Sequence, residues 1–373
     1  MTIDAASSKS KGFNLAEFEE NINIALAKLT VKDKAVFSRQ LSVMFNAGVA
    51  LGKALSTLAD TTENPKLRKA LRQIKVDIET GVSLSVSMAK YPDIFDDLYC
   101  AMVESGEIGG VLDMVLNRLA IALEKSAKLQ NEIKSASAYP KAVGTIAVLV
   151  FYGMTTFLLP TFAGIFEDLG AELPAFTQFM LAISSFTTDW RKMLVLVGII
   201  FGVVFIFKTI YKTEKGCLFF DGLFLKLPLV GNLLKLAAVA RFCNTFSMLT
   251  GAGVPMLSSF EIVARTAGNK VISYAILGAQ EEVAQGGSLT EAFDRANVFP
   301  GMAISMMRIG EETGELDKML SKVGDFYEDE VEQAVKGLTS TLEPIMMVGI
   351  AALVGSILMS MYLPMFAVFD KLG

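Results

Sequence analysis

Three uncharged runs predict membrane-spanning helices in this chain. Ala142–Phe166 and Pro344–Phe369 contain no Asp, Glu, Lys or Arg, and each exceeds the roughly 20 helical residues needed to cross a hydrocarbon core. A shorter run, Met193–Phe207, lies between Lys192 and Lys208. Because a lysine stem can stay in the apolar layer while its charge reaches the membrane surface, this run predicts a third span.

Outside these runs, apolar residues recur at helical spacing. Steps of three and four place them on one stripe of a helix, away from the charged residues. This spacing is followed by Leu112, Leu116, Leu119 and Leu123 in the first half and by Leu316, Leu320, Val323, Tyr327, Val331 and Ala334 in the second. No segment alternates with the two-residue period of a strand. We therefore expect an all-α protein with two antiparallel bundles of about six short helices each.

The two halves of the chain are copies of one unit. Phe37 and Phe242 lie 205 positions apart, and the same offset aligns Ala-Gly-Val at 47–49 with 252–254. A one-residue deletion then changes the offset to 204, as between Pro140 and Pro344. The matches continue into the uncharged runs, so the duplicated unit is a helical bundle together with its membrane helix.

The runs and the repeat together divide the chain into segments. We expect a short polar and amphipathic N-terminal segment at 1–30, a first bundle at 31–141, a first membrane helix at 142–166, a loop with an interfacial helix at 167–192, a second membrane helix at 193–210, a second bundle at 211–343 and a third membrane helix at 344–369. In the N-terminal segment, Phe13–Leu29 predicts an amphipathic helix. The interfacial helix is expected at Leu173–Thr188, which is apolar but opens with Pro174 and carries Gln178.

Lysine placement predicts which side of the membrane each segment occupies. Lys134 and Lys141 precede the first membrane helix, and Lys208 and Lys212 follow the second. Both bundles should therefore be cytoplasmic and the loop at 167–192 periplasmic, in a multi-pass protein of the bacterial inner (plasma) membrane. The polar N-terminus lacks the apolar core of a signal peptide and should be cytoplasmic, with the C-terminus periplasmic.

Composition narrows the chemistry available to the chain. Of its 373 residues, 52% are hydrophobic and 20% are charged, with a net charge of −5 and a mean hydropathy of +0.48. There is no histidine, and Cys100, Cys217 and Cys243 show no CxxC spacing, which excludes histidine-based catalysis and the common zinc sites. No GxxxxGK[ST] loop or basic run occurs. We expect no enzymatic activity, no cofactor, no metal and no nucleic-acid partner.

A Gly-Glu-x-x-Gly-x-Leu motif occurs once in each copy. It comprises Gly106, Glu107, Gly110 and Leu112 in the first copy and Gly310, Glu311, Gly314 and Leu316 in the second. One interpretation is a C-cap glycine and a tight turn, with the carboxylate near the positive end of the next helix. The alternative is a partner contact or metal site, although the Asp/Asn/Gly loop that calcium sites use is absent.

Repeated prolines mark the two ends of the duplicated membrane helices. We expect Pro140 and Pro344 to open these helices, because proline costs little in a first helical turn. Pro160 and Pro364 lie late in the same runs, where they either kink the helix and shape a groove for another membrane helix or mark the helix end. The candidate contact positions of the motifs are Gly48, Gly106, Glu107, Gly110, Pro140, Pro160, Gly253, Gly310, Glu311, Gly314, Glu343, Pro344 and Pro364.

An ordered series of motifs gives the chain a family resemblance. The series in the second copy is Leu227–Gly231 (Leu-Pro-Leu-Val-Gly), Ala240–Phe242 (Ala-Arg-Phe), Gly251–Pro255 (Gly-Ala-Gly-Val-Pro), Gly310–Leu316 (Gly-Glu-Glu-Thr-Gly-Glu-Leu), Leu342–Pro344 (Leu-Glu-Pro) and Tyr362–Phe366 (Tyr-Leu-Pro-Met-Phe). It resembles the family of the type II secretion F protein, which includes the inner-membrane platform proteins of type IV pilus assembly. The resemblance covers roughly Leu29 to Leu372.

This resemblance implies a non-enzymatic platform for type IV pilus assembly. Such a platform would receive pilins or pseudopilins in the lipid membrane, engage a hexameric cytoplasmic assembly ATPase and other inner-membrane assembly proteins, and form a homo-oligomer. Two alternatives stay open: the equivalent platform of type II secretion, and a small oligomeric transporter or channel. The lack of ionisable residues in the uncharged runs argues against transport, because proton and ion pathways normally contain them.

Overall fold

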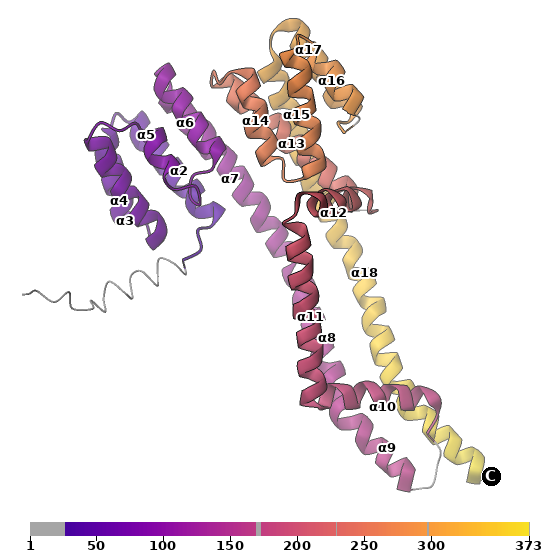
Figure 1. The fold of residues 1–373 in the computed structure, drawn as a ribbon. Helices are drawn as coiled ribbons and strands as arrows, with labels where there is room; N and C mark the ends of the chain where they lie inside the picture. Colours follow the sequence, from indigo (N-terminus) through magenta and orange to yellow (C-terminus); the bar gives the residue numbers. More distant parts are fainter. Residues whose placement is uncertain (1–26, 169–172, 229, 297, 373) are drawn as a thin grey trace, which may run out of the picture.

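The computed structural model describes residues 27–168, 173–228, 230–296 and 298–372, which form helices and connecting turns with no strand among them. The expected all-α class is confirmed. Two bundles lie side by side at one end of long helices that extend away from both (Figure 1). The expected helix Phe13–Leu29 falls almost wholly outside the described residues.

Each bundle contains six helices in the same order, as the repeat predicts. The first consists of α2 (Val31–Asn46), α3 (Leu51–Thr61), α4 (Pro65–Glu79), α5 (Leu84–Ala89), α6 (Asp97–Gly109) and α7 (Leu112–Ala136). The second consists of α13 (Val230–Gly251), α14 (Met256–Thr266), α15 (Lys270–Ala284), α16 (Leu289–Ala296), α17 (Gly301–Thr313) and the first half of α18 (Leu316–Leu372).

Matched caps explain why the two copies start and stop their helices at matching places. Asn64 accepts hydrogen bonds from the first N–H groups of α4, and Asn269 does the same for α15; such a cap is worth about 1 kcal/mol. Gly48 and Gly253 adopt φ of 77° and 87° in the turns that lead to α3 and α14. Glycine reaches these angles without steric cost.

Each bundle packs around its own buried side chains. Phe37 in the first bundle and the aligned Phe242 in the second are 3% and 0% exposed. Phe242 lies in an aromatic cluster, with its ring centroid 4.9 Å from those of both Phe293 and Phe299. Each fully buried ring of this kind contributes about 2–3 kcal/mol of transfer free energy. The buried residues of the two bundles meet in one continuous hydrophobic cluster.

Within the described residues, three helices are long and apolar enough to cross a membrane, as expected. The first span is formed by α8 (Ala138–Gly153), the π-helical turn η1 (Met154–Leu158) and α9 (Leu159–Asp168). The second is α11 (Trp190–Tyr211), about 33 Å long at 1.5 Å per residue, and the third is the last part of α18. A fourth would arise only if α12 (Glu214–Lys226) and α13 were one span, but they are bent by 110° and α13 is buried in the second bundle.

The third span has no break where the sequence predicted its start. Pro140 lies in the first turn of α8, as expected, but Pro344 lies inside α18, which runs unbroken from the second bundle into the membrane helix. The expectation that Pro344 opens a helix was therefore wrong. Ser340, whose carbonyl Pro344 leaves without its helical donor, lines a cavity of about 290 Å³.

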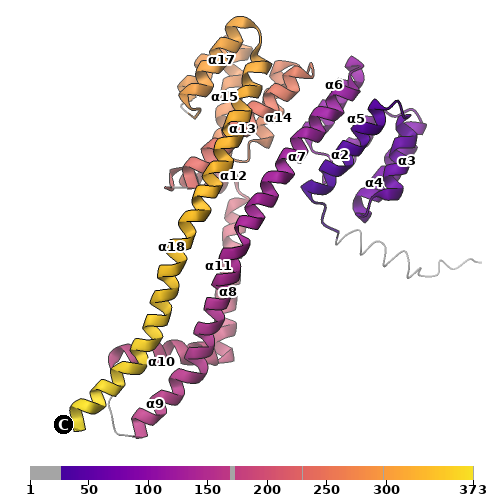
Figure 2. The same ribbon diagram turned by 180° about the vertical axis from the view of Figure 1, so that it is seen from behind.

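Two further helices connect the spans to their surroundings. α10 (Ala175–Thr188) lies across the far end of the spans, between α9 and α18 in both views (Figures 1 and 2). α12 follows α11 and buries Asp221, whose carboxylate accepts from the Tyr211 hydroxyl at 2.7 Å and from the Lys270 N–H at 2.6 Å. These bonds join the end of the second span to α15 of the second bundle.

Candidate functional site

Each repeated glutamate binds the start of a short helix. Glu107 accepts hydrogen bonds from the backbone N–H groups of Leu84 (2.5 Å) and Ser85 (3.1 Å) and from the Ser85 hydroxyl (2.6 Å). All three donor groups belong to Leu84 and Ser85, in the first turn of α5. The carboxylate therefore satisfies N–H groups that no helix carbonyl can reach, at the positive end of the helix dipole.

The second copy repeats this junction. Glu311 accepts from the N–H groups of Leu289 (2.9 Å) and Thr290 (3.2 Å) and from the hydroxyls of Thr290 (2.7 Å) and Ser288 (2.9 Å). The interpretation that each carboxylate lies near the start of the next helix along the chain was wrong. The helix that Glu107 caps is an earlier one, and its Leu84 lies 23 residues away.

The glycines of the motif have two different roles. Gly110 and Gly314 end α6 and α17 at φ of 68° and 72°, which confirms the expected C-caps. Gly106 and Gly310 lie within helices, at positions where the neighbouring helix leaves no room for a side chain. A Cβ on Gly106 would lie 3.1 Å from the backbone of α7, and one on Gly310 would lie 2.8 Å from the Cα of Leu316. The motif therefore holds three helices together, and its role as a partner contact remains a prediction.

Glu311→Gln should destabilise the second bundle by about 1 kcal/mol at neutral pH, because an amide accepts weaker hydrogen bonds than a carboxylate. Burial by itself raises the pKa of the Glu311 carboxyl, but hydrogen bonds from Thr290 and Ser288 outweigh it and hold the pKa below its usual value. A lowered folded-state pKa means that this stabilisation is complete above about pH 5 and is lost as the pH falls through that pKa. Thermal unfolding followed by circular dichroism should show wild type and variant converging at low pH.

Glu312→Gln is the matched control, because the neighbouring carboxylate makes none of the bonds described for Glu311. It should leave the unfolding temperature unchanged at every pH. If the difference between wild type and Glu311→Gln stayed constant down to pH 3, the carboxylate would not be stabilising α16 through its charge.

The cavity beside Ser340 brings candidate residues of the two copies together. Pro140, at the start of α8, and Glu343, within α18, both line the cavity of about 290 Å³, together with Tyr139 and Lys336. The sequence predicted each position separately. The structure places them at one level, where both duplicated helices leave their bundles.

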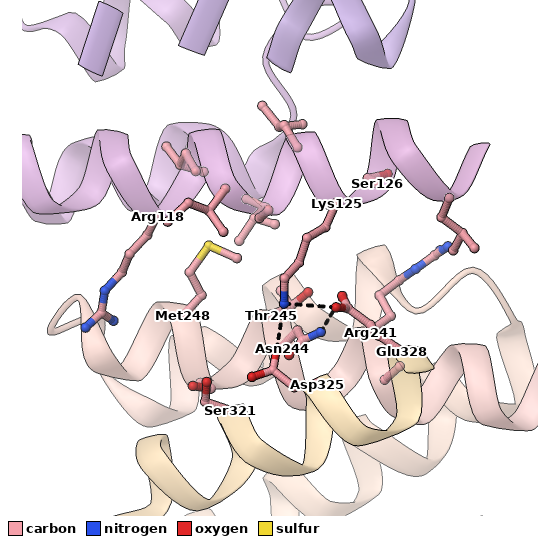
Figure 3. A pocket seen from close by; sticks show the side chains of 18 of the residues that line it. Arg118, Lys125, Ser126, Arg241, Asn244, Thr245, Met248, Ser321, Asp325 and Glu328 are labelled. Carbon is pink, nitrogen blue, oxygen red and sulfur yellow. Dashed lines mark hydrogen bonds and ion pairs between the residues drawn. The ribbon is translucent and has the colours of Figure 1, made fainter. Parts of the chain in front are cut away.

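A groove of about 1340 Å³ lies between the bundles, lined by α7, α13 and α18 (Figure 3). Lys125 of α7 reaches across it, with its Nζ 2.5 Å from Asp325 Oδ1 and 3.1 Å from Glu328 Oε2. Lys128, one turn further along, lies 3.6 Å from Glu332. Ion pairs this exposed contribute about 0–1 kcal/mol each. They align the two bundles more than they hold them together.

Several residues of this contact differ between the two copies. In the first copy, Arg39 binds both carboxylate oxygens of Glu124, each at 2.6 Å. The aligned residues of the second copy are Asn244 and Glu328, which share a single hydrogen bond of 2.6 Å. The other carboxylate oxygen of Glu328 is thereby left for Lys125 of the first copy.

Sequence reasoning missed this contact because it compared the copies only where they agree. The signal was present in the differences, since several aligned pairs that change charge lie at the groove or beside it. Examples are Arg39 and Asn244, Ile121 and Asp325, Lys125 and Asp329, and Lys128 and Glu332.

These sites consist of contacts between helices. Over the residues that the structure describes, no three His, Cys, Asp or Glu side chains gather closely enough to hold a metal ion. Among the acidic residues of the groove, Asp325, Glu328 and Glu332 are instead paired with lysine or asparagine side chains. What the geometry provides is two aligned bundles, each joined to a membrane helix.

Comparison with known proteins gives this arrangement a family. The sequence model described as "Type II secretion system (T2SS), protein F" matches residues 37–160 and 242–364. Each match starts at the aligned phenylalanine of α2 or α13 and ends at Pro160 or Pro364. The matched domain is therefore the bundle with its membrane helix, present twice, as the internal repeat predicts.

Individual relatives extend over almost the whole chain. The type IV pilus assembly protein PilC of Thermus thermophilus is 42% identical over 92% of this chain and 84% of its own length. PilC of Pseudomonas aeruginosa is 39% identical over 93% and 92%. The type II secretion system protein F of Vibrio cholerae is 30% identical over 97% and 86%. This chain belongs to the type II secretion system protein F family.

Proposed function

We propose that this protein is the inner-membrane platform of a type IV pilus, which couples a cytoplasmic assembly ATPase to the incorporation of pilin. The observation that carries the proposal is the direct helical connection between each bundle and its span, over Leu112–Phe166 and Leu316–Phe366. A force applied to a bundle would reach the membrane through a helix and not through a loop. The three apolar helices and the family support a multi-pass inner-membrane protein.

The relatives favour the pilus over secretion. The pilus assembly proteins of Thermus and Pseudomonas are 42% and 39% identical to this chain, whereas the Vibrio secretion protein is 30% identical. The platform of type II secretion, with pseudopilins as its cargo, is the second candidate. A transporter is not favoured, because the uncharged runs contain no ionisable side chain for an ion pathway.

The proposal places the bundles in the cytoplasm, where a hexameric ATPase and other assembly proteins meet them, and the C-terminus in the periplasm. Val86 is 56% exposed on α5. In a background without native cysteines, Val86→Cys should react with an impermeant thiol reagent only after the cells are permeabilised. Labelling in intact cells would contradict this orientation.

Co-purification tests the function itself. The full-length protein, isolated in mild detergent from cells that are building pili, should carry an assembly ATPase and pilin subunits, and no enzymatic activity of its own is expected. Recovery of secretion pseudopilins in place of pilins would identify the second candidate. Recovery of neither the ATPase nor any pilin-like subunit would contradict the platform role.

A further inference from the structure

Two backbone carbonyls within the spans lack their normal helical donors, because proline has no N–H. In α18, Pro364 leaves the carbonyl of Ser360, four residues earlier, without a donor. In the first span, the Leu159 N–H bonds to the Met154 carbonyl across the π-helical turn. The next carbonyl in that register, Thr155, should pair with residue 160, which is proline.

Helix α10 supplies both missing donors. The Thr177 hydroxyl donates to the Ser360 carbonyl at 3.0 Å, and the Ser184 hydroxyl donates to the Thr155 carbonyl at 2.5 Å. The two hydroxyls are seven positions apart on one helix, about 10 Å along its axis. Thr177, Ser184, Thr155 and Ser360 are all 2% exposed or less.

The surroundings of these bonds are apolar. Met180, between the two hydroxyls on α10, packs with Leu159 of the first span and Ile357 of the third, and all three are at most 4% exposed. In such a setting water cannot satisfy a free carbonyl, so an unpaired one is destabilising. The two hydroxyls and the two carbonyls therefore satisfy one another's hydrogen bonds within the protein.

The π-helical turn accounts for a difference between the copies. By the repeat, Ser360 aligns with Thr156, so an α-helical first span would leave the carbonyl of Thr156 unpaired. The extra residue in the turn moves the unpaired carbonyl to Thr155, about 100° around the helix. The carbonyl that results is the one to which Ser184 donates.

We propose that α10 is a crossbar between the two duplicated spans, and that Thr177 and Ser184 are positioning residues that replace the hydrogen bonds lost at Pro364 and Pro160. The crossbar fixes the distance between the first and third spans, so that the pair moves as one body. Only the assembly readout described below rests on the proposed function, since the bonds themselves can be tested by stability alone.

The test is a set of double variants of the full-length protein in lipid nanodiscs. Thr177→Val should lower the unfolding midpoint by about 2–4 °C, which corresponds to about 1 kcal/mol for units of this size. Adding Pro364→Ala should restore most of this loss, because the new backbone N–H at residue 364 can pair with the Ser360 carbonyl. Ser184→Ala and Pro160→Ala should behave in the same way.

Crossed pairs are the matched controls. Thr177→Val with Pro160→Ala, and Ser184→Ala with Pro364→Ala, should show no rescue, because each added N–H then lies in the wrong span. Thr177→Ser keeps the hydroxyl and should match wild type. Equal rescue by matched and crossed pairs, or no rescue by either, would overturn the crossbar.

Pilus assembly separates this inference from the proposed function. If both hold, Thr177→Val should reduce piliation and Thr177→Ser should not. Matched rescue of stability with unchanged piliation in Thr177→Val would keep the hydrogen bonds but overturn the positioning role. Failure of the co-purification test would leave the stability cycle unaffected.

Discussion

If the protein is a pilus platform, inserting seven flexible Gly/Ser residues just before Pro344 should stop pilus assembly while leaving the protein folded, inserted in the membrane and bound to an assembly ATPase. The reason is that α18 is one helix of 57 residues, about 85 Å long. Such a rod carries a rotation or shift of the second bundle into the membrane, and a run of glycine removes its stiffness. The same insertion before Pro140 interrupts the first connection. Piliation is counted by electron microscopy, and ATPase binding is measured by co-purification.

The control is an alanine-rich insertion of the same seven residues. Seven helical residues make almost two full turns. The bundle therefore keeps nearly its original rotation about the axis of α18 relative to the span, and the helix stays rigid. This variant should retain more assembly than the Gly/Ser variant. Normal piliation from both Gly/Ser insertions would rule out the coupling and leave a passive anchor. Equal loss in both kinds of insertion would show that length, and not stiffness, is what matters.

Gly310→Val should be the most destabilising single substitution in the repeated motif, costing about 3 kcal/mol or more. The Cβ would lie 2.8 Å from the Cα of Leu316, and a backbone atom cannot move aside as a flexible side chain can. Gly314→Ala introduces left-handed strain at φ 72° and should cost only about 1–2 kcal/mol. As a consequence, Glu311 would lose its hydrogen bonds to the first turn of α16.

The buried thiol of Cys243, 0% exposed, reports this unfolding through its reaction with a fluorescent maleimide during heating. Gly349→Val is the control, since nothing lies within 4 Å of the Cβ position there. It should leave the midpoint unchanged. A Gly310→Val protein as stable as wild type would mean that α17 and α18 do not approach as closely as described.

The sequence determined the parts of this fold that depend on local pattern. Uncharged runs have few physical alternatives to a membrane helix, and the repeat fixed the order of six helices in each bundle. The continuity of α18 was missed because proline usually interrupts a helix, and no local signal shows that Pro344 lies inside one. The partner of Glu107 was missed because it lies 23 residues away.

The charge differences at the groove show that the two copies have diverged into halves with different roles in their contact. Two first bundles placed side by side could not form the same contact, because Arg39 would occupy Glu124 and an isoleucine would stand where Asp325 binds Lys125. Gene conversion that made the copies alike would therefore erase the alignment of the bundles. The halves are no longer interchangeable, and a chimera that carries either half twice should lose the fixed orientation that the native pair has.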